Sequence, residues 1–301
     1  MKTFTNLRNL YGSLTNNTSS ANLTLGDQMI NDSHRAICAL KDWPFLEKVR
    51  TLSTTATVQA VNLPYDCDQV REISVIPIGS TTRYVPKLSP SAAHWDTLNS
   101  STFTSDIPEW YFVRAGQILL WPVPASTGNT IYVTQKSRVI DLNIADITST
   151  TIASITSGAT AMVVNAGLTV QMAGFWIIPT LSTTVNTGDG RWYEISGVGS
   201  ATTLTLVRAY GGLTIAAGTA ACTIGQMPLL PEAFHEIPVK RAVSQYWAIQ
   251  KDSKMSLLYE KQYKDDIASL ERNWSSPTTD MVIDDGRDHD MLNPNLTISL
   301  P

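Results

Sequence analysis

The hydrophobic period of the chain changes twice along its length, and this change constrains the fold more than any other feature. Near the C-terminus apolar residues recur mostly four positions apart, which predicts a helix with one buried stripe. The stripe consists of Met255, Leu258, Tyr259, Tyr263, Ile267, Leu270 and Trp274. Between Thr51 and Gln226 the period is two, which is typical of half-buried strands. Helical ends around a β-rich middle predict an α+β protein.

The first forty residues predict two further helices. Apolar residues spaced i, i+3, i+4 and i+7 form one helical face, at Leu7, Leu10, Tyr11 and Leu14. The polar run from Thr15 to Ala21 indicates a loop, and a second helix is expected from Leu25 to Lys41. Pro44 ends it, because the residue before a proline is disfavoured in the α region.

The helices from both ends are expected to form one bundle, built from residues 1–50 and 228–276. Pro231 and Pro238 suit first helical turns, Asp252 or Ser253 can cap the last helix, and Pro277 ends it. The predicted bundle core is Ile37, Trp43, Phe234, Tyr246, Trp247, Tyr259, Tyr263, Ile267 and Leu270. Packing of this kind makes the helical part discontinuous in sequence.

Two β units are expected between the helices. Residues 51–140 predict an antiparallel, sandwich-like unit, with an alternating strand at Thr55–Ala60, a corner at Leu63–Asp66 and a hairpin over Trp110–Trp121. Residues 141–227 contain no lysine and show short strand-like runs separated by turn signals. That pattern predicts an inserted small barrel or sandwich. Residues 277–301 are expected to form an extended C-terminal tail.

The chain has few charged residues, which is common in proteins that bury much of their surface in an assembly. Only 16% of residues are charged, against roughly 25% in average soluble domains. The net charge of −4 disfavours a general nucleic-acid-binding surface. Cys38, Cys67 and Cys222 match no metal or redox spacing. We expect no signal peptide and no membrane span, because no apolar run is long enough.

No pattern of residues indicates catalysis, and we expect no catalytic, metal or cofactor site. His34, His94, His235 and His289 lack metal-ligand spacing, and His94 with Trp95 is expected in a loop. The acidic cluster between Asp280 and Asp290 lacks the register of a calcium loop. A carboxylate pair remains an alternative, for which the stretch from Thr148 to Gln226 offers only the acids Asp189 and Glu194.

The order of parts, together with two short motifs, resembles the head-to-tail adaptor of tailed bacteriophages, the family that includes the tail tubular protein A of short-tailed phages. The first motif ends the N-terminal helices and is matched by Asn31, Ile37, Trp43 and Phe45. The second leads into a helix and is matched by Leu230, Pro231, Glu232, Phe234, Ala242 and Tyr246. The resemblance covers residues 1–140 and 228–275, so the insertion departs from the smaller members.

The resemblance implies a structural virion protein at the head–tail junction, present in the host cytoplasm before assembly. It implies a homo-oligomeric ring of twelve subunits beneath the portal, joined to downstream stopper or tail proteins. The ring would conduct DNA during ejection without reading its sequence. A tail that orders on a partner can wrap its surface, so Asn293, Asn295, Leu296, Ile298 and Leu300 are expected to contact the portal or a neighbouring subunit.

Three alternatives stay open at this point. A neck stopper or tail-terminator protein would share the location, although such proteins are mostly β and lack a long terminal helix pair. A carbohydrate-binding receptor module would need exposed aromatic residues on the insertion, where Trp176 and Trp192 could form a sugar platform. An enzyme would rely on Asp189 or Glu194.

Overall fold

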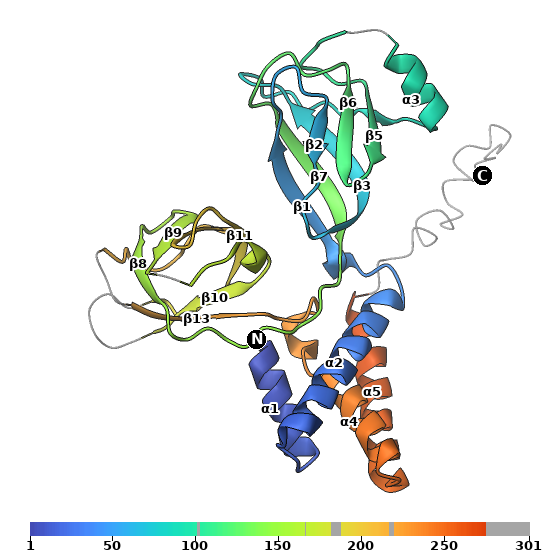
Figure 1. Ribbon diagram of the computed structural model, residues 1–301, viewed down its shortest axis with the longest axis vertical. Coiled ribbons are helices and arrows are strands. Elements are labelled where there is room, and N and C mark those ends of the chain that lie inside the picture. The colour runs from blue at the N-terminus through green and yellow to red at the C-terminus, as the bar shows by residue number, and fades with distance from the viewer. Residues whose placement is uncertain (101–102, 166, 182–187, 217–219, 275–301) are drawn as a thin grey trace, which may run out of the picture.

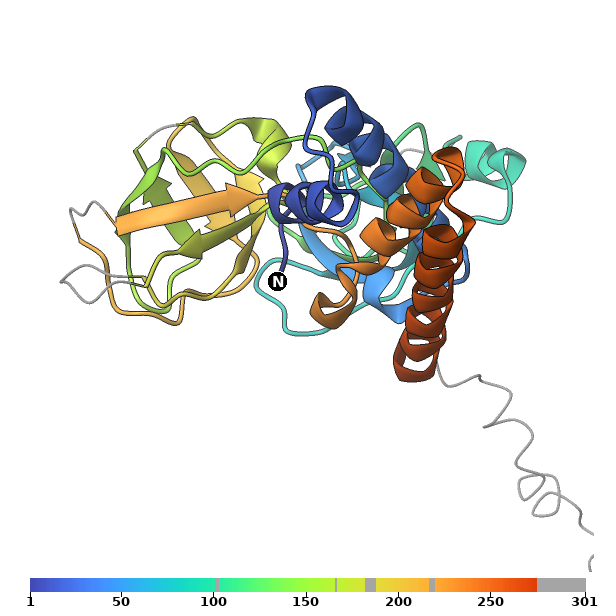
Figure 2. The same cartoon turned by 90° about the horizontal axis from the view of Figure 1, so that it is seen from below.

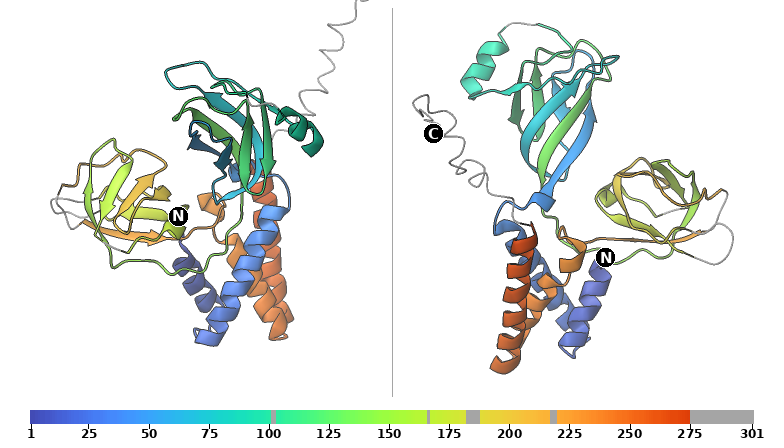
Figure 3. Two further views of the ribbon diagram at one scale, coloured as in Figure 1. Left: turned by 45° about the horizontal axis from the view of Figure 1, so that its top comes forward. Right: turned by 180° about the vertical axis from the view of Figure 1, so that it is seen from behind.

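The computed structural model describes residues 1–100, 103–165, 167–181, 188–216 and 220–274. It confirms the α+β class. Figure 1 shows a helical bundle at the bottom, a β unit above it and a separate small barrel at the side. The view from below and the two further views show the barrel standing beside the bundle and the β unit rather than between them (Figures 2 and 3).

The bundle contains four helices from the two ends of the sequence. They are α1 (Phe4–Leu14), α2 (Ser20–Ala39), α4 (Ile237–Ile249) and α5 (Ser253–Trp274). The expected loop at Thr15–Ala21 is present but ends at Ser19, and the expected helix start at Leu25 was wrong, because α2 already begins at Ser20. Ser19 caps this helix, and its side chain accepts a hydrogen bond from the Asn22 N–H. The cap satisfies a backbone donor that the first turn leaves free.

Helix α1 packs closely on α2 through a glycine. A Cβ atom placed on Gly26 would lie 2.4 Å from the ring of Tyr11, so a larger residue there would displace that ring. Tyr11 is fully buried and meets Tyr246 of α4 edge-to-face, with ring centroids 6.1 Å apart. A glycine that permits close approach thus brings three of the four helices together.

The β unit consists of two antiparallel sheets packed face to face, apart from one short parallel pair. One sheet has the order β1-β7-β3, with bounds Glu47–Ser53, Thr130–Ser137 and Cys67–Ile76. The other has the order β2-β6-β5-β4, with bounds Ala60–Asn62, Gln117–Trp121, Trp110–Arg114 and Lys87–Leu88. Their facing side chains form the core Ile73, Val75, Tyr111, Ile118, Leu120, Ile131 and Val133. Strand β1 begins at Glu47, although residues 1–50 were expected to belong to the bundle.

Two local expectations in the β unit were wrong. The stretch expected as a strand at Thr55–Ala60 contains a turn, and only Ala60 belongs to a strand, β2. Thr57 has a φ of 61°, and its N–H donates to the Pro124 carbonyl. His94 and Trp95 lie in a short helix, α3 (Ala92–Leu98), instead of a loop. Ser91 caps this helix, and the buried Trp95 ring stacks on Phe112.

Residues 151–225 form a closed six-stranded barrel. Its strands are β8 (Thr151–Ile155), β9 (Ala161–Val164), β10 (Trp176–Pro179), β11 (Tyr193–Val198), β12 (Thr203–Leu206) and β13 (Ala220–Gly225). They close in the order β10-β11-β12-β9-β8-β13. Closure removes the open edges that a small sheet would expose. The interior is apolar, and includes Ile152, Ile177, Ile195 and Ile224.

Candidate assembly site

The predicted bundle residues divide between two apolar clusters. Tyr246, Trp247 and Tyr259 pack with α1 and the middle of α2. Ile37, Trp43, Phe234, Tyr263, Ile267 and Leu270 pack at the opposite end, near the start of β1. Within the stripe of α5, Leu258 and Trp274 remain 48% and 38% exposed, so the buried face is shorter than the spacing predicts.

Trp43 fixes the end of the bundle that meets the β unit. Its indole N–H donates to the Ile37 carbonyl at 2.8 Å, and its ring stacks on Phe45 with centroids 5.3 Å apart. Phe45 in turn contacts Trp274, the last residue of α5, edge-to-face at 5.9 Å. The N-terminal motif residues therefore join α2 to the end of α5.

Asn31, the first residue of that motif, ties α2 to the strand-like linker that leads to the barrel. Its amide nitrogen donates to the Leu142 carbonyl at 2.9 Å, and its oxygen accepts the Leu142 N–H at 2.7 Å. Both contacts are buried. A paired side-chain amide of this kind replaces a missing strand partner, so Asn31 fixes where the chain leaves for the insertion.

His34 holds the chain in place where it returns from the barrel to the bundle. Its Nε2 accepts the N–H of Leu229 at 3.0 Å, within a fully buried setting. Burial, with further contributions from His235 and Arg35, lowers the pKa of His34 to about 4. The ring is therefore neutral at pH 7, as an acceptor nitrogen requires.

The stem of the barrel is held by side chains of its own and of the N-terminus. Gln226 Oε1 accepts the N–H groups of Asn143 and Ile144, each at 2.7 Å. Thr3 donates to the Asp146 carboxylate at 2.6 Å. The Gln226 side chain thus joins the two chains of the stem to each other. The Thr3 bond, together with a bond from the Phe4 N–H to the Gln226 carbonyl, attaches the stem to the start of the bundle.

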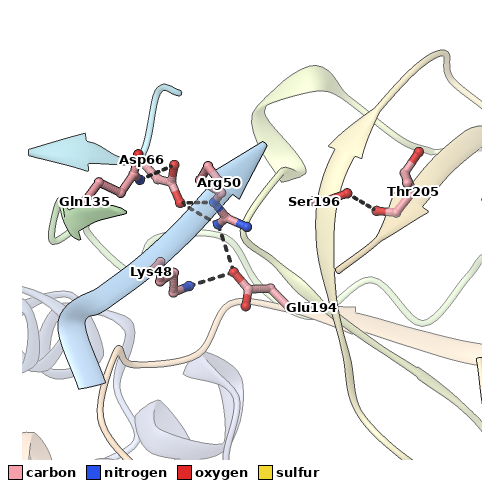
Figure 4. Close-up of polar contacts among 7 residues, drawn as sticks. All are labelled: Lys48, Arg50, Asp66, Gln135, Glu194, Ser196 and Thr205. Atoms are coloured by element: carbon pink, nitrogen blue, oxygen red, sulfur yellow. Dashed lines mark hydrogen bonds and ion pairs between the residues drawn. The ribbon is translucent and has the colours of Figure 1, made fainter. Parts of the chain in front are cut away.

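A charged junction joins the barrel to the β unit (Figure 4). Glu194 of β11 accepts from Lys48 at 2.6 Å and from Arg50 at 3.1 Å, both on β1. Arg50 also donates to Asp66 at 2.5 Å, and Gln135 of β7 donates to the other Asp66 oxygen at 3.0 Å. Burial alone would lower the pKa of Arg50, but Asp66 and Glu194 raise it, so the guanidinium stays charged.

Two clefts flank this junction. One, of about 320 Å³, is lined by Lys48 and Tyr65 together with apolar residues such as Leu142, Phe175 and Met227. The other, of about 440 Å³, lies between β1 and the barrel strands β11 and β12. Both are lined by Tyr65 and Asp66, so the two clefts meet at the corner that carries one partner of the ion pairs.

Several large apolar side chains are exposed at the tip of the α4–α5 hairpin. Ile249 is 58% exposed, Leu257 69% and Leu258 48%. Clusters of such residues mark surfaces that meet a partner more often than isolated ones do.

The candidate catalytic acids are engaged in structural contacts. Asp189 accepts hydrogen bonds from the Tyr193 hydroxyl at 2.5 Å and the Arg191 N–H at 3.2 Å. Glu194 belongs to the junction above. Trp176 and Trp192 are half-buried rather than standing free as a platform. Within the part of the chain that the structure covers, no group of three or more His, Cys, Asp or Glu residues could hold a metal ion.

Other predicted residues lie outside the described part of the chain. These are the tail residues Asn293, Asn295, Leu296, Ile298 and Leu300, His289, and the acidic cluster between Asp280 and Asp290. Searched over its described residues, the chain has no helix long and apolar enough to cross a membrane.

The comparison with family models matches residues 2–282 to the SU10 adaptor protein family. This match defines the chain as a structural adaptor of bacteriophages, and the resemblance to head-to-tail adaptors is confirmed. The chain belongs to the SU10 adaptor protein family. A comparison with curated proteins found no match.

Sequence reasoning missed the residues that join the units. Lys48, Arg50 and Asp66 are unremarkable in a strand and a corner, and their partner Glu194 is far away in sequence. One feature of the sequence could have indicated this contact. Glu194 lies on a strand of a segment that contains no lysine, and a carboxylate that is buried there needs a basic partner from another part of the chain. Asn31 was noted only as a motif residue, and the structure supplies its physical role.

Proposed function

We propose that this chain forms a ring of twelve subunits beneath the portal and joins the portal to downstream stopper or tail proteins. The family match across residues 2–282 carries the proposal, because it includes the insertion as well as the bundle. In the proposed division, residues 1–50 and 228–276 form the adaptor bundle, 51–140 the β unit and 141–227 the inserted barrel. Residues 277–301 are the tail.

The exposed hairpin tip supports self-assembly. Ile249, Leu257 and Leu258 present apolar surface that a solitary subunit would leave in water. In a ring each subunit meets its neighbours through two different surfaces, which close by rotation. The terminal residues Asn293–Pro301 dock on the portal or on a neighbouring subunit.

The charge distribution supports a DNA conduit. The last 27 residues contain five aspartates and one arginine, so residues 1–274 hold 21 basic and 21 acidic residues. A balanced body attracts phosphates weakly and does not retain passing DNA. A protein that reads a DNA sequence places side chains in a groove of the duplex. A DNA conduit does not need such side chains.

Native mass spectrometry of the purified chain, alone and with portal rings, tests the proposal. The expected species has the mass of twelve copies, either alone or bound to a portal. A chain that stays monomeric at all concentrations and also fails to bind portals would contradict it. Stoichiometry other than twelve would correct the symmetry while leaving the ring intact.

A further inference from the structure

The outer strands of the β unit differ in how well they could accept another strand. β2 and β4 are three and two residues long. β3 carries Asp68, Arg71 and Glu72, and its pairing with β7 shifts register twice. Bulges hinder further pairing. β1 carries charges as well, at Glu47, Lys48 and Arg50, but it keeps seven consecutive pairs with β7 without a shift. Among the strands that the structure describes, β1 is therefore the long regular edge of this unit.

The cleft of about 440 Å³ follows this edge. Four consecutive β1 residues, Val49–Leu52, line it on one side, and Ser196, Leu206 and Val207 of the barrel line the other. Successive side chains of a strand point to opposite faces, so a cleft that touches four in a row follows the edge rather than one face. Val49 and Val207 are 57% and 44% exposed, which leaves its walls partly apolar and open.

One segment of the chain outside the described part has the pattern of a strand. Asn295, Thr297 and Ser299 alternate with Leu296, Ile298 and Leu300. Prolines at positions 294 and 301 bound the segment, and proline within a sheet is confined to strand ends and edges. The period of two over six residues indicates a strand with one apolar face.

This segment starts within reach of the edge. Trp274, which ends α5, contacts Phe45, two residues before β1 begins. Residues 275–294 then connect Trp274 to Asn295, and twenty residues span up to about 65 Å when extended. A seven-residue strand is about 24 Å long, so the tether covers the whole edge.

We propose that the C-terminal segment Asn295–Leu300 pairs with the free edge of β1 in the same subunit and lies in the cleft between β1 and the barrel. Free N–H and C=O groups of an edge strand bind an extended segment along its length. An uncovered regular edge invites aggregation, and a tethered segment competes well because its effective concentration is high. Leu296, Ile298 and Leu300 then contact the apolar walls.

The proposal goes beyond ring formation and does not rest on it, since edge and tail belong to one subunit. The same residues are proposed to dock on the portal or a neighbour, so the partner and the β1 edge compete for the tail. In the free subunit the tail segment stays paired with β1 until a partner binds the segment and releases it from that edge.

Cysteine cross-linking in the full chain tests the pairing. Thr51→Cys on the exposed side of β1 is combined with Ile298→Cys in the tail, because Thr51 shares a face with Val49 and Ile298 lies on the apolar face that contacts it. The native cysteines stay in place, because all three are buried and burial raises the pKa of Cys38 and Cys222 to about 12. Mild oxidation should give an intramolecular disulfide at least tenfold more often than the control pair Thr24→Cys with Ile298→Cys, which samples exposed α2.

Hydrogen exchange gives a second readout. The β1 amides should exchange at least tenfold faster in the Ile298→Pro chain, because proline breaks the added strand. The matched variant Asp284→Pro, upstream of the segment, should leave them unchanged. Equal exchange in all three chains, together with cross-linking no better than the Thr24 control, would overturn the pairing. A disulfide that forms only between chains would assign the edge to a second copy and overturn it as well.

Discussion

Arg50 on β1 and Glu194 on β11 lie 3.1 Å apart, and this ion pair links two β units that are 144 residues apart in sequence. Lys48 contacts the same carboxylate oxygen. The side chains of Arg50 and Glu194 are only 14% and 12% exposed, so solvent screens the contact less than it would a surface pair. The junction ties the barrel to β1, next to both clefts.

Substituting Glu194 therefore tests the junction. Glu194→Gln keeps the shape but leaves Lys48 without its charge partner, and we expect a loss of about 2 kcal/mol in unfolding free energy. A double-mutant cycle with Lys48→Met should give a coupling energy of about 1 kcal/mol or more. Ser196→Ala is the control, because Ser196 bonds Thr205 within the barrel. Additive losses in the cycle would show that the pair contributes nothing.

Neighbouring aromatic residues on α4 should differ in their effect on stability. Tyr246 is 7% exposed, whereas Trp247 is only partly buried against the same cluster. Tyr246→Ala should cost about 3–4 kcal/mol and Trp247→Ala about half of that. Chemical denaturation of both variants checks the ranking, and a larger loss for Trp247 would contradict this packing.

Acid should destabilise the bundle through His34. Its pKa is about 4 in the folded state, below the usual 6.5, so the unfolded chain binds the proton first. This contribution is fully present above pH 6.5 and is lost as pH falls toward 4, by about 3 kcal/mol in total. His34→Gln keeps an acceptor for the Leu229 N–H. The variant should show a shallower fall in melting temperature between pH 7 and 4.5, and an unchanged slope would contradict this role.

The barrel should be removable without loss of the bundle. Ile147 and Ile224 form a paired bridge, with N–H···O distances of 2.8 and 2.9 Å in the two directions. Replacing residues 148–223 by Asn-Gly closes a hairpin at this bridge and retains Gln226. Circular dichroism should show the helical signal intact with cooperative melting. Complete unfolding would mean that the bundle depends on the barrel.

The sequence predicted features that rest on local periodicity. The last helix, α5, and the Trp110–Trp121 hairpin follow from spacing alone, and both occur in the structure. The start of α2 was misplaced because a cap at Ser19 outweighs the polar composition of the first turn. Thr55–Ala60 alternates like a strand, but Thr57 adopts a left-handed conformation that turns the chain.

Contacts between units could not be predicted in the same way. Glu194 and Arg50 meet only because the barrel folds back beside β1, and no local pattern encodes that position. Asn31 and His34 read as helix residues, whereas their side chains bind backbone groups 111 and 195 residues away. Such bonds depend on how the elements pack in space, whereas hydrophobic periodicity predicts only the elements themselves.

The central claim is that the chain is an adaptor ring at the head–tail junction. Electron cryomicroscopy of assembled particles tests it most directly, because the bundle, the β unit and the barrel have distinct shapes that can be placed in the density. We predict a ring of twelve copies directly beneath the portal, around the DNA channel. Density for this fold at the tail tip or on the capsid surface, with none beneath the portal, would contradict the account.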